Sequence, residues 1–172
     1  MKSIVIYSSL TGNTKQVAEA ITSVLPAGTP CVSMQELPSD VSSYDLVFAG
    51  FWVDKGTANK EARDVLGTLH NPYIALFATA GVPPQMAHAK ESLINAANCL
   101  PDGVEPVGTF ICQGKVDPKV IEMMYKMFPK GHSHGQSADR DARHKQAAVH
   151  PNEDDFKAAQ DFAQHILAKL DR

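Results

Sequence analysis

The sequence has few cysteines, and they are too widely spaced to form a disulfide framework. Its 172 residues contain three, Cys31, Cys99 and Cys112, with no CxxC pair among them. Small secreted domains held by disulfides use an even set of cysteines, and zinc or thiol-redox motifs use closely spaced pairs. The cysteine content therefore argues against both classes of protein.

Long apolar runs and a strong net charge are also missing. No run is long enough to span a bilayer, and the apolar run at residues 4–7 is too short for a signal peptide. The 16 basic and 19 acidic residues give a formal net charge of −3, without the basic excess typical of a nucleic-acid binder. We therefore expect a cytoplasmic protein with no membrane span and no nucleic-acid partner.

What the chain does contain is a regular alternation of two hydrophobic patterns. Short continuous apolar runs, typical of strands buried on both faces, alternate with apolar residues at helical spacing. The predicted strands are residues 4–7, 30–35, 46–51, 73–78 and 104–112. The predicted helices are residues 17–25, 58–69, 86–97, 120–128 and 156–170. This order predicts an α/β fold, a doubly wound five-stranded parallel sheet with helices on both faces.

Residues 129–151 interrupt the alternation and are rich in Gly, Ser, His and charged residues. We expect a polar, solvated surface loop here, within a single domain over residues 1–172. A flap or docking surface beside the ligand site is a second possibility. Metal chelation is a third, although the spacing matches no closed zinc module. His132 and His134 are its candidate chelating pair, and His144 or Asp139 would complete the site.

The predicted helix just before this segment carries several methionines. Met123, Met124 and Met127 precede Phe128 at the end of the helical stripe. Packing against the sheet is the default expectation for such residues, and a soft contact surface is the alternative.

The loop after the first predicted strand suits an anion. It reads Ser9-Leu10-Thr11-Gly12-Asn13-Thr14 and leads directly into a helix. In open parallel sheets, ligands bind at the carboxyl ends of the strands, and a helix N-terminus presents unpaired N–H groups. Neither GxGxxG nor GxxxxGK[ST] is present, so a nicotinamide dinucleotide site or a nucleotide-binding P-loop is not supported. The loop predicts a site for a phosphate monoester; a simple helix cap with a turn glycine is the competing interpretation.

This loop resembles the FMN phosphate loop of the flavodoxin family, written (S/T)xTGxT. Ser9, Thr11, Gly12 and Thr14 occupy the motif positions, and the order of strands and helices extends the resemblance over nearly the whole chain. The resemblance implies the strand order 2-1-3-4-5 and a non-covalent FMN with its phosphate on residues 9–14.

The same resemblance implies that the isoalloxazine ring lies between the loops after the third and fourth strands. The third-strand loop offers Phe51, Trp52, Asp54 and Gly56. Trp52 is the only tryptophan, and its flat apolar face suits stacking on a flavin. Asp54 either accepts a hydrogen bond from the ring or caps the following helix, and Gly56 permits close approach of the backbone.

The loops after the last two predicted strands complete the expected site. Thr79, Ala80 and Gly81 follow the fourth strand, where many flavodoxins place a tyrosine that this chain lacks. The second face of the ring is therefore covered by another group or left open. The run Cys112-Gln113-Gly114 follows the fifth strand and is expected near the ribityl chain or ring. For Cys112, a buried small hydrophobe is favoured over a redox thiol.

The predicted function is an FMN-binding flavodoxin-like protein that carries electrons between a reductase and an acceptor. No residue is a convincing acid, base or nucleophile, because the flavin itself carries the electrons. An FMN-dependent reductase acting directly on a quinone or similar acceptor is one alternative; a flavin-free or metal-linked binding module on the same fold is another. The loops at residues 50–52 and 112–115 resemble those of flavodoxin-like proteins associated with bilin reduction, which implies a separate reductase. The expected partners are a redox protein or a small-molecule acceptor.

Overall fold

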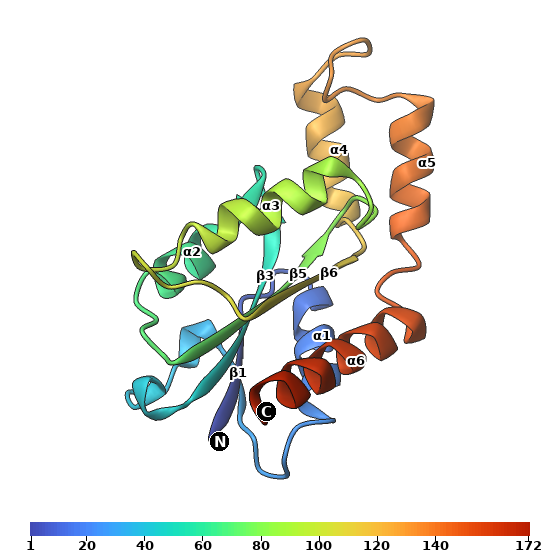
Figure 1. Ribbon diagram of the computed structural model, residues 1–172. Coiled ribbons are helices and arrows are strands. Elements are labelled where there is room, and N and C mark those ends of the chain that lie inside the picture. The colour runs from blue at the N-terminus through green and yellow to red at the C-terminus, as the bar shows by residue number, and fades with distance from the viewer.

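A parallel sheet forms the centre of the molecule in the computed structural model, which describes residues 1–172 (Figure 1). Its order is β2-β1-β3-β5-β6, and the short β4 pairs antiparallel with the end of β3. The strands are β1 (Ser3–Tyr7), β2 (Cys31–Ser33), β3 (Leu46–Asp54), β4 (Thr57–Ala58), β5 (Tyr73–Ala80) and β6 (Gly108–Gln113). Counting the parallel strands alone, this is the order 2-1-3-4-5, so the predicted fold class is confirmed.

Helices cover both faces of this sheet. The six helices of the chain are α1 (Asn13–Thr22), α2 (Lys60–Leu66), α3 (Ala87–Ala97), α4 (Pro118–Met127), α5 (Ala138–Ala147) and α6 (Glu153–Leu170), of which α1, α2, α3 and α6 cover the sheet. Two short 3₁₀ turns, η1 (Met34–Glu36) and η2 (Val41–Ser43), follow β2. Leu66 and Ala96 bury α2 and α3 on one face, whereas Ile21 and Ile166 bury α1 and α6 on the other. None of the helices has the length and apolar character needed to cross a membrane.

The central strands are apolar along their length because both of their faces are covered. Strands β3 and β5 pack so closely that β3 needs a glycine at the position that faces an aromatic ring of β5. Gly50 lies opposite Phe77, and a Cβ atom at Gly50 would lie 2.1 Å from Phe77 Cζ. The phenyl ring fills the space beside the glycine, which holds β3 and β5 in register and fixes the two loops that follow them.

The segment at residues 129–151 differs from the expected loop, because it contains helix α5. The Ser137 hydroxyl accepts a hydrogen bond from the Arg140 amide at the N-cap, and the first turn carries Asp139 and Asp141. A hydroxyl cap and acidic residues at this end stabilise a helix. Only Ala147 of the helix is buried. The prediction of a loop was wrong because a helix without an apolar stripe has no hydrophobic period to reveal it.

Helix α4 is also unlike its prediction, because it does not pack on the sheet. None of its residues is buried, and Met123 and Met127 are more than half exposed. In Figure 1, α4 and α5 extend together beyond the sheet, at the end where β3, β5 and β6 finish. Tyr125 of α4 donates a hydrogen bond from its hydroxyl to Asp141 Oδ1 (3.0 Å), which joins the two helices. The core-packing expectation for the methionines was therefore wrong.

Candidate functional site

A cavity of about 400 Å³ lies at the carboxyl ends of β1, β3, β5 and β6. This is where the strand order reverses between β1 and β3, the position at which open α/β sheets bind ligands. The fold therefore brings together loops that are far apart in the sequence. Eleven of the residues selected from the sequence line the cavity: Ser9, Leu10, Thr11, Asn13, Thr14, Trp52, Asp54, Thr79, Ala80, Gly81 and Gly114.

The loop between β1 and α1 presents unpaired backbone donors. Gly12 adopts a left-handed conformation (φ 96°) as the N-cap residue, which is why glycine suits this position. Ser9 Oγ accepts hydrogen bonds from the amides of Gly12 (3.1 Å) and Lys15 (3.3 Å). The amides of Asn13 and Thr14 have no acceptor within the protein. Two donors at the positive end of α1 are thus available to an anion.

The side chains of Asn13 and Thr14 form hydrogen bonds within the protein and so are not free to bind a ligand. Asn13 Nδ2 donates to the carbonyl of Lys115 (2.8 Å), which joins α1 to the segment after β6. The buried hydroxyls of Thr14 and Thr79 lie 2.9 Å apart and share a hydrogen bond between α1 and β5. The hydroxyl of Thr11 makes no hydrogen bond within the protein, and that of Ser9 accepts but does not donate. Those two hydroxyls are therefore the ones free to donate to an anion.

A tight hairpin at the end of β3 places Trp52 and Asp54 on the cavity. Lys55 and Gly56 have φ values of 50° and 79°, the positive values of a two-residue type I′ turn. The turn reverses the chain into β4 before α2 begins, and Asn59 is the N-cap residue of that helix. The alternative in which Asp54 caps the following helix was therefore wrong.

One wall of the cavity comes from α4 and the loop before it, which the sequence did not identify. Val116, Val120 and Met124 give this wall its apolar surface. A Cβ atom at Gly81 would lie 2.6 Å from Val116 Cγ2, so the glycine lets the β5 loop approach this wall. The available signal was Asp117-Pro118, shortly after the fifth predicted strand, an N-cap pattern that starts a helix at the carboxyl edge. Val53, Lys115 and Asp117 also line the cavity.

Five of the expected residues do not line the cavity: Gly12, the N-cap residue of α1, and four that lie behind its surface or away from it. Phe51 is fully buried in the core, and Cys112 and Gln113 are each 2% exposed. Burial, with a smaller contribution from Asp155, raises the pKa of the Cys112 thiol to about 12. The thiol therefore stays protonated and packs as a small apolar group. Gly56 occupies the hairpin turn, where its conformation is needed.

The histidines at the α4–α5 turn are arranged as an aromatic cluster. The rings of His132 and His134 lie 4.6 Å and 5.3 Å from the ring of Phe128. No group of three or more His, Cys, Asp or Glu side chains is positioned to hold a metal ion. The geometry thus adds no support to the metal-linked alternative.

Comparison with known proteins identifies the family. The model of the family described as "Flavodoxin domain" matches residues 4–164. The chain belongs to the flavodoxin family. It is 35% identical over 176 residues to the flavodoxin-like domain-containing protein BilS of Clostridioides difficile (strain CD3), covering 98% of both chains. It is 34% identical to BilS of Clostridium symbiosum (strain WAL-14163), covering 94% of both. Family membership supports the prediction that the cofactor is FMN.

Solved structures agree on the fold at low sequence identity. A Streptococcus pneumonia TIGR4 flavodoxin superposes with a TM-score of 0.57 at 14% identity, covering 97% of this chain and 98% of the other. A flavoprotein of Lactobacillus acidophilus NCFM in complex with FMN gives a TM-score of 0.52 at 19% identity, covering 64% of this chain and 93% of the other. These neighbours show that the flavodoxin architecture extends over nearly the whole chain.

Proposed function

We propose that this flavodoxin-family protein binds FMN in the cavity, with the phosphate on residues 9–14. The observation that carries the proposal is the pair of unpaired amides at Asn13 and Thr14, beside the free hydroxyls of Ser9 and Thr11. This set fits the three oxygens of a phosphate monoester, and the helix dipole adds to the attraction. The solved flavoprotein with FMN at 19% identity supports the choice of cofactor.

The ring of FMN would lie between Trp52 and the apolar wall formed by Val120 and Met124. These three side chains line the same cavity and present aromatic and aliphatic surface to a planar ring. FMN, when bound, supplies the group that accepts and gives electrons. The carboxyl groups of Asp54 and Asp117 also line the cavity. Carboxylates there would disfavour added negative charge on the ring, whereas the ammonium group of Lys115 in the same lining would favour it.

We further propose that the protein carries electrons between a reductase and an acceptor in the cytoplasm. The cavity is lined by hydroxyl, amide, carboxylate, ammonium and apolar groups, with no cysteine or histidine. Its residues are thus suited to holding and tuning a flavin, and chemistry on a substrate by protein side chains is not favoured. The three cysteines are unpaired, as expected in a reducing compartment. The resemblance to flavodoxin-like proteins associated with bilin reduction favours a separate reductase.

Flavin titration tests the placement of the phosphate. Ser9→Ala with Thr11→Ala removes two donors to a charged group, and we expect FMN affinity to fall about tenfold or more. Riboflavin, which lacks the phosphate, should bind wild type and variant equally. Thr109→Ala is the matched control, an exposed threonine at the opposite end of β6. Quenching of flavin fluorescence reports both affinities, and an unchanged FMN affinity in the double variant would contradict the placement.

Anaerobic reduction assays test the role as a carrier. The FMN-loaded protein is mixed with NADPH or NADH alone, and then with an added flavodoxin reductase. A carrier stays oxidised until the reductase is present, because it has no site for the nicotinamide donor. Rapid bleaching of the flavin by either nucleotide alone would contradict the carrier role and establish that the protein is itself an FMN-dependent reductase.

A further inference from the structure

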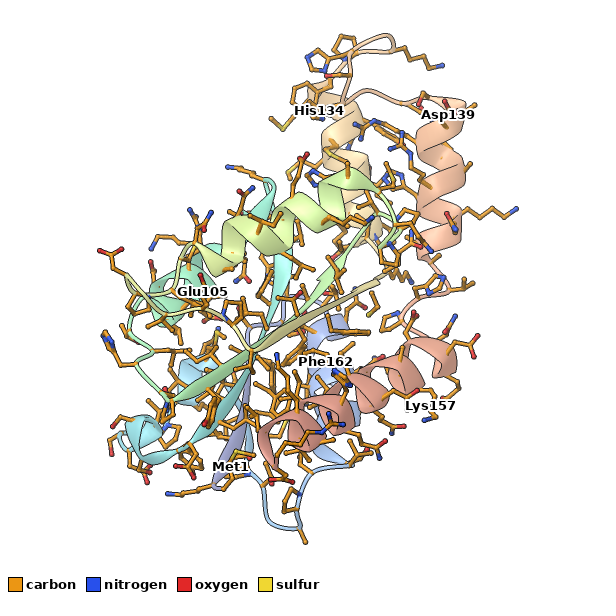
Figure 2. All side chains as sticks on the ribbon, viewed as in Figure 1. Met1, Glu105, His134, Asp139, Lys157 and Phe162 are labelled. Carbon is orange, nitrogen blue, oxygen red and sulfur yellow. The ribbon has the colours of Figure 1, made fainter.

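A second cavity, of about 340 Å³, lies beside the first, between the loop after β5 and the projecting α4–α5 segment. The loop after β5 separates the two, and Gly81 lines both. The other walls come from the start of α3 and from the α4–α5 segment, whose His134 and Asp139 are labelled near its outer end in Figure 2. Its lining holds five basic or titratable side chains and no acidic one: His88, His134, Arg140, Arg143 and His144.

The two arginines of this cavity, both half-buried, take part in no ion pair. Arg140 donates from Nε (3.0 Å) and Nη2 (2.6 Å) to the carbonyl of Ser133. Arg143 donates only from Nε, to the carbonyl of Asp139 at 3.4 Å. Nη1 of Arg140 and both terminal nitrogens of Arg143 therefore have no acceptor within the protein. Arg143, with both terminal nitrogens free, is suited to bidentate binding of a carboxylate or a phosphate, and Arg140 can add one hydrogen bond from Nη1.

The carboxylate of Asp141, on the same helix, is already held by other groups. Asp141 accepts hydrogen bonds from the hydroxyl of Tyr125 (3.0 Å) and from Nε2 of Gln136 (3.1 Å). Burial lowers the pKa of His144, and the charges of Arg140 and Arg143 lower it further. Asp141 opposes this shift from outside the cavity lining. The lining itself therefore presents cationic groups with no carboxylate among them, which suits an anion from outside the chain.

We propose that this second cavity binds the carboxylate or phosphate group of the small molecule that exchanges electrons with the cofactor. The link to electron exchange rests on the proposed function; the binding of the anion does not. Because Gly81 lines both cavities, a ligand anchored at the arginines can extend its reducible part across the β5 loop to the first cavity. The arginines lie within a concavity, which favours a small molecule over the flat acidic surface of a partner protein.

Titration of the flavin-free protein with glutarate, a dicarboxylate, tests this proposal directly. Arg143→Gln is the decisive variant, because its terminal nitrogens make no hydrogen bond that the fold needs. We expect its affinity for glutarate to fall at least tenfold by calorimetry. Lys145→Gln is the matched control, an exposed cation on the same helix that does not line the cavity. It should leave glutarate affinity unchanged.

A second titration, with inorganic phosphate on the FMN-loaded protein, separates the two sources of the anion. Tighter binding of glutarate points to a carboxylate-bearing acceptor, whereas tighter binding of phosphate points to a phosphorylated donor. Failure of both probes to bind the wild type, or an equal loss in Arg143→Gln and Lys145→Gln, would overturn the proposal. FMN affinity is measured on the same variants and should not change, so failure of the flavin site is distinguished from failure of the anion site.

Discussion

At the residue scale, burial decides which of the three cysteines can react. The pKa of Cys112 is raised to about 12, and burial also raises the pKa of the half-buried Cys31. Because the thiolate is the reactive form, we expect iodoacetamide at pH 8 to leave Cys112 unmodified in the folded protein. Peptide mass spectrometry before and after unfolding in guanidinium checks this. Modification of Cys112 without denaturant, at the rate of Cys99, would show that its strand opens readily.

The residue types that form the site were easier to predict from the sequence than the hydrogen-bond partners of their side chains. The hydroxyl, glycine and amide pattern of residues 9–14 identifies an anion loop, and the structure places this loop on the cavity. The hydrogen bond between Thr14 and Thr79 was not predictable, because it joins residues 65 apart in the chain. The hydrogen bond from Asn13 to the carbonyl of Lys115 was unpredictable for the same reason, because the two residues lie far apart in the chain. Local patterns show what a side chain can do, and tertiary packing decides which option it takes.

At the element scale, the β3–β4 hairpin carries a residue that its turn disfavours. Lys55 has φ 50°, a left-handed conformation that costs most side chains about 1 kcal/mol, whereas asparagine tolerates it. An Asn-Gly pair is also the preferred type I′ turn. We expect Lys55→Asn to raise the free energy of unfolding by about 0.5 kcal/mol in urea titrations. Lys60→Asn, at the exposed start of α2, is the control and should not stabilise; a loss of stability in Lys55→Asn would contradict the turn assignment.

A helix or strand was predictable from the sequence when its packing against the sheet requires a regular hydrophobic pattern. The central strands and helices α1 and α6 have such a period, because they bury an apolar face against the sheet. Helix α5 has none and forms through its Ser137 cap and terminal charges. The methionines of α4 follow a helical hydrophobic period but do not pack against the sheet, because this helix lies beyond the sheet and lines the cavity. A periodic stripe shows that a face is apolar without showing what lies against it.

At the scale of the whole molecule, the sheet and the projecting α4–α5 pair differ in how firmly they are held. The strands β1, β3 and β5 are buried on both faces, whereas α4 has no buried residue and α5 has one. The strand order was predictable from the family resemblance. Nothing in the sequence pattern indicated that α4 and α5 extend beyond the sheet. Few apolar contacts mean a low free energy of local opening. The α4–α5 pair is therefore expected to open independently of the sheet, at the place where the two cavities meet.

This difference predicts a pH-dependent opening controlled by His144. Burial, and then the positive charge of Arg140, lowers the pKa of His144 below its usual value of 6.5 in the closed state, although Asp141 opposes the shift. Between the two pKa values the opened state binds more protons, so stability of the closed pair rises with pH and falls on acidification. Hydrogen-exchange protection factors at pH 8 and pH 5, which remove the intrinsic pH dependence of exchange, measure the effect. We expect protection in α4 and α5 to fall at pH 5 while that of β1, β3 and β5 is retained.

The variant His144→Gln isolates the histidine from the other groups that titrate in this range. Glutamine keeps a hydrogen-bonding side chain beside the Tyr125 hydroxyl, which lies 3.1 Å from His144 Nδ1, but cannot gain a proton. The loss of protection between pH 8 and pH 5 should therefore be smaller in the variant than in the wild type. His165→Gln, at an exposed position on α6, is the control and should behave as the wild type. An equal loss in His144→Gln would assign the pH dependence to another group. A smaller loss would show that protonation of the half-buried His144 controls the opening of the α4–α5 pair.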